Sequence, residues 1–140
     1  MSRIYWDTNL FVYLFEDFGT LSQSVVDLRR RMLSRKDELF TATLTLGELL
    51  VKPLEKSDDR LAAEFKRRLL SSCILTPFDQ RAAQIYGAIR RDRSLKPPDA
   101  IHLACAAAIG IDLFITNDTG LTKKIIPGIH FITPLNQAPL

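Results

Sequence analysis

The sequence predicts an α/β fold, a single domain in which a five-stranded parallel sheet is flanked by helices on both faces. Five short apolar runs of strand character alternate with longer segments of helical periodicity. No linker, repeat or low-complexity segment divides the chain, so we expect residues 1–140 to form one domain. The hydrophobic fraction of 46% and the charged fraction of 25% are ordinary for a globular protein with its own core.

The strands are predicted where short apolar runs end at turn residues. These runs are RIYW at 3–6, ELFTA at 38–42, CILTP at 73–77, DLFIT at 112–116 and IHFIT at 129–133. The prolyl residue of the third run stops that strand. In open parallel sheets the ligand site lies just beyond the carboxyl ends of the strands. Chemically active side chains should therefore gather at that edge.

The segments between these strands are predicted to be helices. Helical spacing or capping residues mark 10–16, 21–36, a segment from Thr43 or Thr45 to Glu55, 58–72, 79–92 and 97–110, and a short helical turn at 120–125. Prolines begin the helix at 97–110 and Gly110 ends it. The helix at 21–36 should bury one side, made of Leu21, Val25, Leu28, Met32 and Leu33.

The charge is mildly basic, with a net charge of +3 and a sequence pI of about 9.0. Lys and Arg occur in clusters, and one of them leads directly into Asp99. It consists of Arg90, Arg91, Arg93 and Lys96. Taken alone, such clusters are more often solvated helix faces than binding sites.

The two cysteines, Cys73 and Cys105, lie in apolar runs and have no Cys or His at ligand spacing. We interpret both as reduced core residues. The chain opens with no signal peptide and has no apolar stretch long enough to span a bilayer. We therefore expect a cytoplasmic location and no membrane partner.

Four acidic residues, distant in the sequence, are placed to reach the same edge of the predicted sheet. Asp7 ends the first strand and Asp118 follows the fourth. Asp99 opens the helix at 97–110, and Glu48 lies about one turn into the helix after the second strand. The remaining acids lie mostly in mixed-charge helices and are typical of surface.

Each of these acids also has a structural interpretation. Asp7 fits a helix N-cap, Asp99 fits the first turn of its helix, and Asp118 fits a turn residue. Glu48 lies in an apolar stretch, where a carboxylate must be paired or bound to a metal. Lys52, one turn later, is the alternative partner for it.

Four carboxylates in one site would repel one another, and a divalent cation removes that repulsion. Ligands that are all oxygen select Mg²⁺ or Mn²⁺ over zinc. We therefore expect Asp7, Asp99 and Asp118 to be metal ligands, supported by Asn9 and Thr116. Asn9 fits the N-cap of the following helix equally well. We expect the two histidines not to be metal ligands. His102 is predicted to pack in the core, with a substrate-facing role as the alternative, and His130 is predicted to lie in a strand.

The motifs DTN, TLGEL, PPDAIHLACA and ITND occur in this order over nearly the whole chain. The sequence thereby resembles the PIN-domain ribonucleases, and among them the VapC toxins of toxin–antitoxin pairs. The resemblance implies a PIN-like domain whose acidic site is formed by Asp7, Glu48, Asp99 and Asp118. It also implies an endoribonuclease dependent on Mg²⁺ or Mn²⁺, usually a homodimer, that a cognate antitoxin holds inactive.

Thr45 matches the hydroxyl that the family usually carries three residues before the glutamate, but two positions depart from the pattern. Ala42 stands where many relatives have a serine, which affects the support of Glu48. Gly120 stands where many have a further acid, so we expect one firmly held ion rather than two.

The predicted activity is metal-assisted hydrolysis of phosphodiester bonds in single-stranded or looped RNA. Arg90, Arg91, Arg93 and Lys96 would bind phosphates beside the acidic site. One alternative is a phosphatase of the haloacid-dehalogenase type, whose second acid is replaced here by Asn9. Another is a PIN-like module that binds RNA or protein without cutting.

Overall fold

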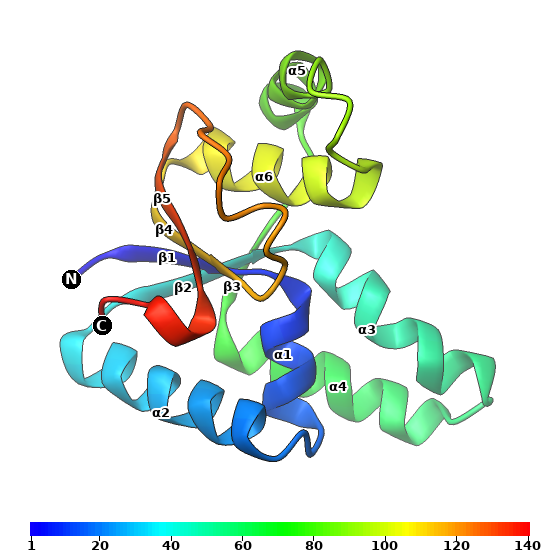
Figure 1. Cartoon of the computed structure of the whole chain (residues 1–140). Coiled ribbons are helices and arrows are strands. Elements are labelled where there is room, and N and C mark those ends of the chain that lie inside the picture. Colours follow the sequence, from blue (N-terminus) through cyan, green and yellow to red (C-terminus); the bar gives the residue numbers. More distant parts are fainter.

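The computed structural model describes all residues 1–140 and contains one sheet between two layers of helices (Figure 1). The strands are β1 (Arg3–Trp6), β2 (Glu38–Ala42), β3 (Ile74–Thr76), β4 (Ile111–Thr116) and β5 (Ile129–Pro134). The helices are α1 (Thr8–Phe15), α2 (Thr20–Arg35), α3 (Thr43–Glu55), α4 (Asp59–Ser72), α5 (Gln80–Ile89) and α6 (Pro97–Ile109), followed by a 3₁₀ turn at Leu135–Gln137.

The five strands form one parallel sheet in the order β3-β2-β1-β4-β5, which confirms the predicted fold class. In this order β1 is central, with β2 and β4 as its neighbours. Trp6 of β1 pairs with Ile115 of β4, so the residues that follow them, Asp7 and Thr116, lie side by side. The carboxyl edge of the sheet therefore collects polar groups from β1 and β4.

Alternation along the strands divides the apolar side chains between two cores. Ile4 and Trp6 of β1 face a core shared with α1, α2, α3 and α4. Tyr5 faces the opposite core, shared with α5 and α6. Figure 1 shows these two helical layers on opposite sides of the sheet. The acidic edge is thus placed between two packed cores.

Helix α2 buries a narrower stripe than its sequence predicts. Val25, Leu28 and Met32 are fully buried, but Leu33 is 60% exposed and Leu21, in the first turn, is 36% exposed. Leu33 follows Met32 directly and is turned about 100° around the helix from it. The buried stripe advances in steps of three and four residues through Val25, Leu28 and Met32, which excludes Leu33. Leu21 lies on the same side one turn before Val25, but at the start of the helix it stays exposed. The prediction that both are buried was wrong.

Two of the predicted segments differ from the structure. Helix α5 ends at Ile89, before the predicted residue 92, because Asp92 accepts hydrogen bonds from both the backbone and the hydroxyl of Ser94 and closes a turn. Residues 120–125 form turns and irregular structure rather than a helical turn.

The cysteines differ from each other in their surroundings. Cys105 is buried as expected, but Cys73 is only partly buried; both are free thiols. Burial raises the pKa of Cys105 to about 11 and that of Cys73 to about 12, so both stay protonated at neutral pH. No helix is both long enough and apolar enough to cross a membrane.

Candidate functional site

Asp7 is held at the end of β1 by contacts to two other parts of the chain. Its backbone N–H donates to the carbonyl of Ile115 at 3.0 Å. Its carboxylate accepts the N–H of Thr8 at 2.8 Å and the hydroxyl of Thr116 at 2.7 Å. Asp7 is therefore the N-cap of α1, and only 7% of it is exposed. Its position is set by the sheet and by the helix together.

Asn9 lies inside α1, so the interpretation of Asn9 as the N-cap was wrong. Asp7 already occupies the cap two residues earlier. The Asn9 side-chain oxygen is buried without a hydrogen-bond partner, and Asn9 makes no hydrogen bond to Asp7. In this structure Thr116, rather than Asn9, holds the Asp7 carboxylate.

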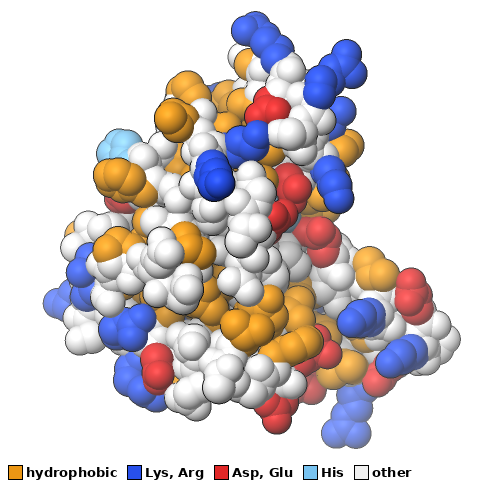
Figure 2. Space-filling model, in the orientation of Figure 1, with side chains coloured by type: hydrophobic (Ala, Val, Ile, Leu, Met, Phe, Trp, Pro, Cys, Tyr) orange, Lys and Arg blue, Asp and Glu red, His pale blue; other side chains and the backbone are white.

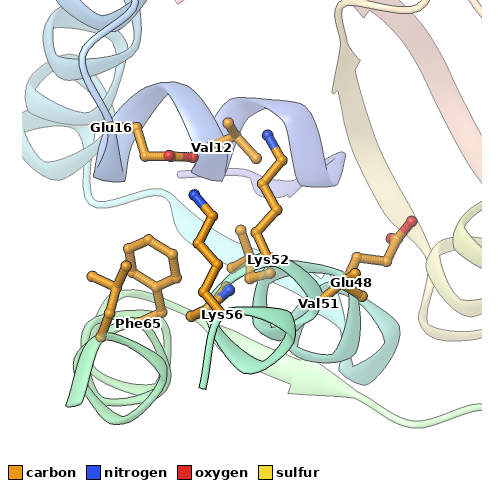
Figure 3. Close-up of a pocket in the computed structure, with 10 residues that line it drawn as sticks. Val12, Glu16, Glu48, Val51, Lys52, Lys56 and Phe65 are labelled. Carbon is orange, nitrogen blue, oxygen red and sulfur yellow. The ribbon is translucent and has the colours of Figure 1, made fainter. Parts of the chain in front are cut away.

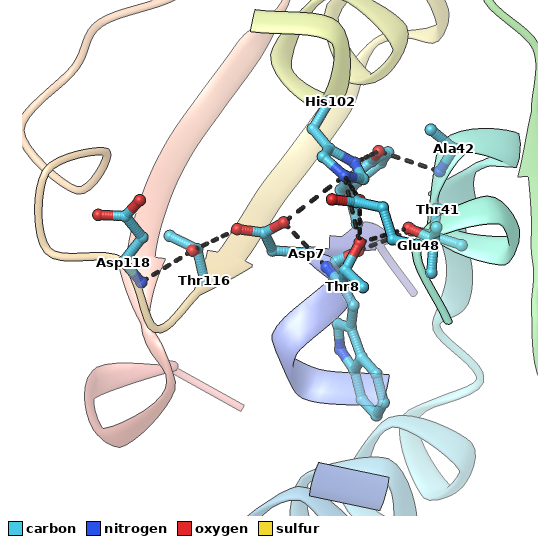
Figure 4. A network of polar contacts seen from close by, with 11 residues as sticks. Asp7, Thr8, Thr41, Ala42, Glu48, His102, Thr116 and Asp118 are labelled. Atoms are coloured by element: carbon cyan, nitrogen blue, oxygen red, sulfur yellow. Dashed lines mark hydrogen bonds and ion pairs between the residues drawn. The ribbon is translucent and has the colours of Figure 1, made fainter. Parts of the chain in front are cut away.

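Thr116 also connects Asp7 to Asp118. Its hydroxyl oxygen accepts the backbone N–H of Asp118 at 3.0 Å while its hydrogen goes to Asp7 (Figure 4). The exposed Asp118 carboxylate accepts the N–H of Gly120 at 2.9 Å and so closes the turn after β4. A Cβ atom at Gly120 would lie 3.2 Å from that carboxylate, so any side chain there requires Asp118 to shift.

The pKa of Asp99, in the first turn of α6, is affected by the charges of Asp7 and Asp118. Burial raises its pKa, and the negative charges of Asp118 and Asp7 raise it further, against smaller opposing effects of His102 and Lys96. Asp99 and Asp118 share a cavity of about 240 Å³ that Lys96 also lines. The structure thus brings three of the four predicted acids close enough for mutual repulsion.

Glu48 reaches the edge by a different route. Its carboxylate oxygen Oε1 accepts a hydrogen bond from Thr8 at 2.8 Å and lies 2.7 Å from Nε2 of His102. Burial raises the pKa of Glu48, but the hydrogen bonds to His102 and Thr8 outweigh it, and the net shift is downward. Lys52 forms no ion pair with Glu48; Figure 3 shows the two side chains pointing in different directions.

His102 takes a larger part in the site than its sequence context predicts. It is only 2% exposed, as a packing role requires, but both of its ring nitrogens have polar partners: Nδ1 the hydroxyl of Tyr5, and Nε2 Glu48 and Thr8. The signal in the sequence was its position three residues after Asp99, on the same side of α6.

Comparison with known protein families identifies the family of this chain. The model of the PIN domain family matches residues 4–125, which is most of the chain. The chain belongs to the PIN domain family. A search of the curated proteins found no match.

This PIN domain is also similar to solved toxin–antitoxin structures. VapBC2 from Rickettsia felis bound to a DNA fragment matches with a TM-score of 0.76 and 15% identity, over 94% of this chain and 98% of that one. DNA-bound VapBC from Salmonella typhimurium matches with a TM-score of 0.73 and 20% identity, over 96% of this chain and 99% of that one. A toxin–antitoxin complex from Klebsiella pneumoniae matches with a TM-score of 0.63 and 24% identity, over 90% of this chain and 94% of that one. At these identities the likeness shows a shared fold.

The chemistry of the acids fits a hard divalent cation. All candidate ligands at the edge are carboxylate oxygens. Burial and repulsion by Asp118 and Asp7 raise the pKa of Asp99, and a cation would relieve the repulsion. As they stand, no three His, Cys, Asp or Glu side chains are arranged to hold a metal ion. Asp7, Asp99 and Asp118 therefore fit by charge and donor type, and binding requires local side-chain rotation.

The predicted basic cluster divides into two kinds of residue. Arg90 is partly buried, donates to the carbonyl of Leu95 at 3.2 Å and lies over the ring of Tyr86, so it supports the loop before α6. The other three members are exposed; they are Arg91, Arg93 and Lys96. Figure 2 shows Lys and Arg side chains over the α5 end of the molecule, with acidic side chains below them.

Two further hollows adjoin the acidic edge of this PIN domain. A polar cleft of about 750 Å³ is lined by Lys123 and by the start of the 3₁₀ turn, and it shares Gly120 with the acidic cavity. A more apolar groove of about 370 Å³ runs between α1, α3 and α4, with Glu48 at one end (Figure 3). Lys52 and Lys56 cross this groove toward α1.

Asp99→Asn should make the metal-free protein more stable at neutral pH, raising its unfolding temperature by a few degrees. The folded state raises the pKa of Asp99, so its ionised form opposes folding. At low pH Asp99 is protonated and does not oppose folding. Its destabilising effect develops as the pH rises through its folded pKa. The gain of the variant should therefore grow with pH, as measured by thermal unfolding between acid and neutral pH.

Asp59→Asn is the matched control, because Asp59 lies in the first turn of α4, exposed and away from these acids. It should give no gain, since it loses only a favourable interaction with the helix dipole. A neutral-pH decrease in the unfolding temperature of Asp99→Asn would contradict the repulsion described above.

Proposed function

We propose that this PIN domain is an endoribonuclease dependent on Mg²⁺ or Mn²⁺, and that it is the toxin of a toxin–antitoxin pair. The observation that carries the proposal is the gathering of Asp7, Asp99 and Asp118 at the carboxyl edge of the sheet, where burial and the charges of the other two raise the pKa of Asp99. Such crowding costs stability and is typical of sites that bind a cation. The fold shared with the VapBC structures supports the toxin assignment.

The residues divide into two roles in the proposed reaction. Asp7, Asp99 and Asp118 would hold the ion, which, when bound, lowers the pKa of a water molecule and neutralises charge on the phosphate. Glu48 has a lowered pKa, so it is ionised at neutral pH and can accept a proton from the attacking water. Its Oε1 atom is occupied by hydroxyl and imidazole partners, which leaves Oε2 for that task.

RNA would be held by the exposed cations beside the acids. Arg91, Arg93 and Lys96 precede Asp99, and Lys123 lines the polar cleft that adjoins the acidic cavity. Without nearby positive charge, an acidic site would repel its own substrate. The RNA strand would then cross the acids from the loop before α6 into this cleft.

The second candidate is a PIN domain that binds RNA without cutting it. Both Asp7 oxygens already accept hydrogen bonds within the protein, which favours this candidate, because a metal ligand must give up or share such bonds. The exposed Arg and Lys side chains would serve either function.

The cleavage assay distinguishes the two candidates. Purified protein with Mn²⁺ should cut mixed cellular RNA, and a chelator should stop it. Asp7→Asn and Asp99→Asn should each lower the rate by about 100-fold or more while the circular dichroism spectrum is unchanged. Asp59→Asn, with the same loss of charge at a distant surface, should cut like the parent. Absence of cutting by the parent under all these conditions would favour the binding module.

RNA binding should weaken steeply with salt, because the proposed contacts are to phosphates. The Asp7→Asn protein allows binding to be measured without cleavage. Replacing Arg91 and Arg93 together by Ala should lower the slope of log K against log salt by roughly 0.7 for each phosphate that is no longer bound. The matched control is Lys66→Ala with Arg67→Ala, because both side chains are exposed on α4 in the opposite helical layer. A flat salt dependence would exclude these phosphate contacts.

We propose that a segment of the cognate antitoxin occupies the groove between α1, α3 and α4. The groove has apolar walls, among them Leu49 and Phe65, and two lysines, which suit an amphipathic segment with acidic residues. Because Glu48 lines one end, the segment would also reach the acidic edge. By the family resemblance we propose a homodimer as well, which light scattering would measure.

Val51→Glu should weaken inhibition by the antitoxin at least about 10-fold without changing cleavage by the free protein. Val51 lines the groove and is 52% exposed, so a charge there meets the partner rather than the core. Leu70→Glu is the control, since Leu70 is 51% exposed on α4 but does not line the groove. Equal inhibition of the two variants, measured by titrating antitoxin into the cleavage assay, would count against this site.

A further inference from the structure

We propose that His102 is a positioning residue, fixed by Tyr5 and Ala42 in the tautomer whose hydrogen is on Nε2, so that it directs the Glu48 carboxylate toward the acidic edge. The hydrogen-bond chain runs from the backbone of β2 through two buried rings to α3 (Figure 4). The catalytic role of His102 rests on the proposed function, because Glu48 acts only in that reaction. The assignment of the tautomer does not depend on the proposed function.

The chain begins at a main-chain donor whose direction is fixed. The N–H of Ala42 donates to the hydroxyl oxygen of Tyr5 at 2.9 Å. That oxygen lies 2.6 Å from Nδ1 of His102. Burial raises the pKa of Tyr5 well above its usual value, and the negative charge of Asp7 adds to this, so the phenol keeps its hydrogen. With Ala42 already donating to the oxygen, the phenol hydrogen is directed to Nδ1.

A ring nitrogen that accepts a hydrogen bond carries no hydrogen, so the hydrogen of neutral His102 is on Nε2. This N–H faces Oε1 of Glu48 at 2.7 Å, whereas the nearest Asp7 oxygen is 3.8 Å away. Glu48 is therefore its partner. The interaction links two side chains 54 residues apart in the sequence.

Thr8 completes the positioning of Glu48. Its hydroxyl donates to the same Oε1 atom at 2.8 Å, so two donors converge on one carboxylate oxygen. Oε2 makes no hydrogen bond within the protein. Two donors on one oxygen fix the orientation of the carboxylate plane and leave the other oxygen free. The arrangement orients a proton acceptor without occupying it.

The tautomer can be tested by ¹⁵N NMR of the imidazole rings, since protonated and unprotonated ring nitrogens resonate far apart. The chain has only two histidines, and His130, 72% exposed at its side chain beside Asp112, is an internal reference in the same spectrum. In the wild-type protein His102 should show hydrogen on Nε2 alone. Hydrogen on Nδ1 would overturn the proposal.

Tyr5→Phe should convert this single state into a mixture of tautomers, because Nδ1 loses its donor. The substitution keeps the ring that stacks on Phe114 at 4.8 Å between centroids, and it also removes the acceptor of the Ala42 N–H. Tyr13→Phe is the matched control: its hydroxyl accepts from Asn117 and has no contact with His102. An unchanged His102 spectrum in Tyr5→Phe would also overturn the proposal.

Activity provides a second readout that a purely structural histidine would not produce. His102→Ala should lower kcat by about 10- to 100-fold with little change in KM for RNA, the usual cost of losing a group that orients a catalytic residue. His102→Gln, whose amide N–H can replace Nε2–H, should recover most of this loss. Equal loss in both variants, at equal unfolding temperatures, would overturn the positioning role.

The two proposals fail separately. A parent protein that cuts no RNA removes the proposed function and the catalytic role of His102 with it, whereas the ring spectrum still decides the tautomer. Cleavage by the parent together with hydrogen on Nδ1 of His102 would overturn this inference and leave the nuclease intact.

Discussion

The parallel pairing of β1 with β4 is the constraint on which the site depends. Trp6 and Ile115 are in register, and the N–H of Asp7 continues the ladder to the carbonyl of Ile115. A shift of one residue would turn Asp7 and Thr116 to opposite faces and separate the carboxylate from its hydroxyl donor. The apolar side chains on both faces of β1 make such a shift costly, so the two cores that stabilise the fold also fix the position of the first acid.

The same edge carries a conflict between stability and chemistry. Asp7, Asp99 and Asp118 are brought together by three separate elements, and burial together with the charges of the other two disfavours ionisation of Asp99. Glu48 is treated differently, because two donors lower its pKa and make it ionised without strain. The three aspartates thus lack a positive partner that a cation would supply, whereas the charged form of Glu48 is already stabilised by hydrogen bonds. This difference is what separates ion binding from proton transfer in the proposed site.

Much of the fold was predictable because it depends on local patterns. The short apolar runs, the prolines before α6 and Gly110 after it placed most boundaries within one or two residues. The errors occurred where several local options were open. Leu33 and Met32 are both apolar and both favour helices, and only the packing of α2 decides which of them is buried. Asn9 is a good cap in isolation, but the helix begins two residues earlier, where Asp7 accepts the N–H of Thr8.

The positions of the acids followed from the topology, whereas their partners did not. A parallel sheet implies that Asp7 and Asp118 share an edge, but nothing local links Glu48 to His102. Side chains on α3 and α6 meet only when both helices are packed, each on its own face of the sheet. The hydrogen-bond chain that orients His102, moreover, begins at the peptide nitrogen of Ala42 and not at its methyl group. Every residue except proline supplies that nitrogen, so comparing side chains at position 42 between relatives would not reveal this support.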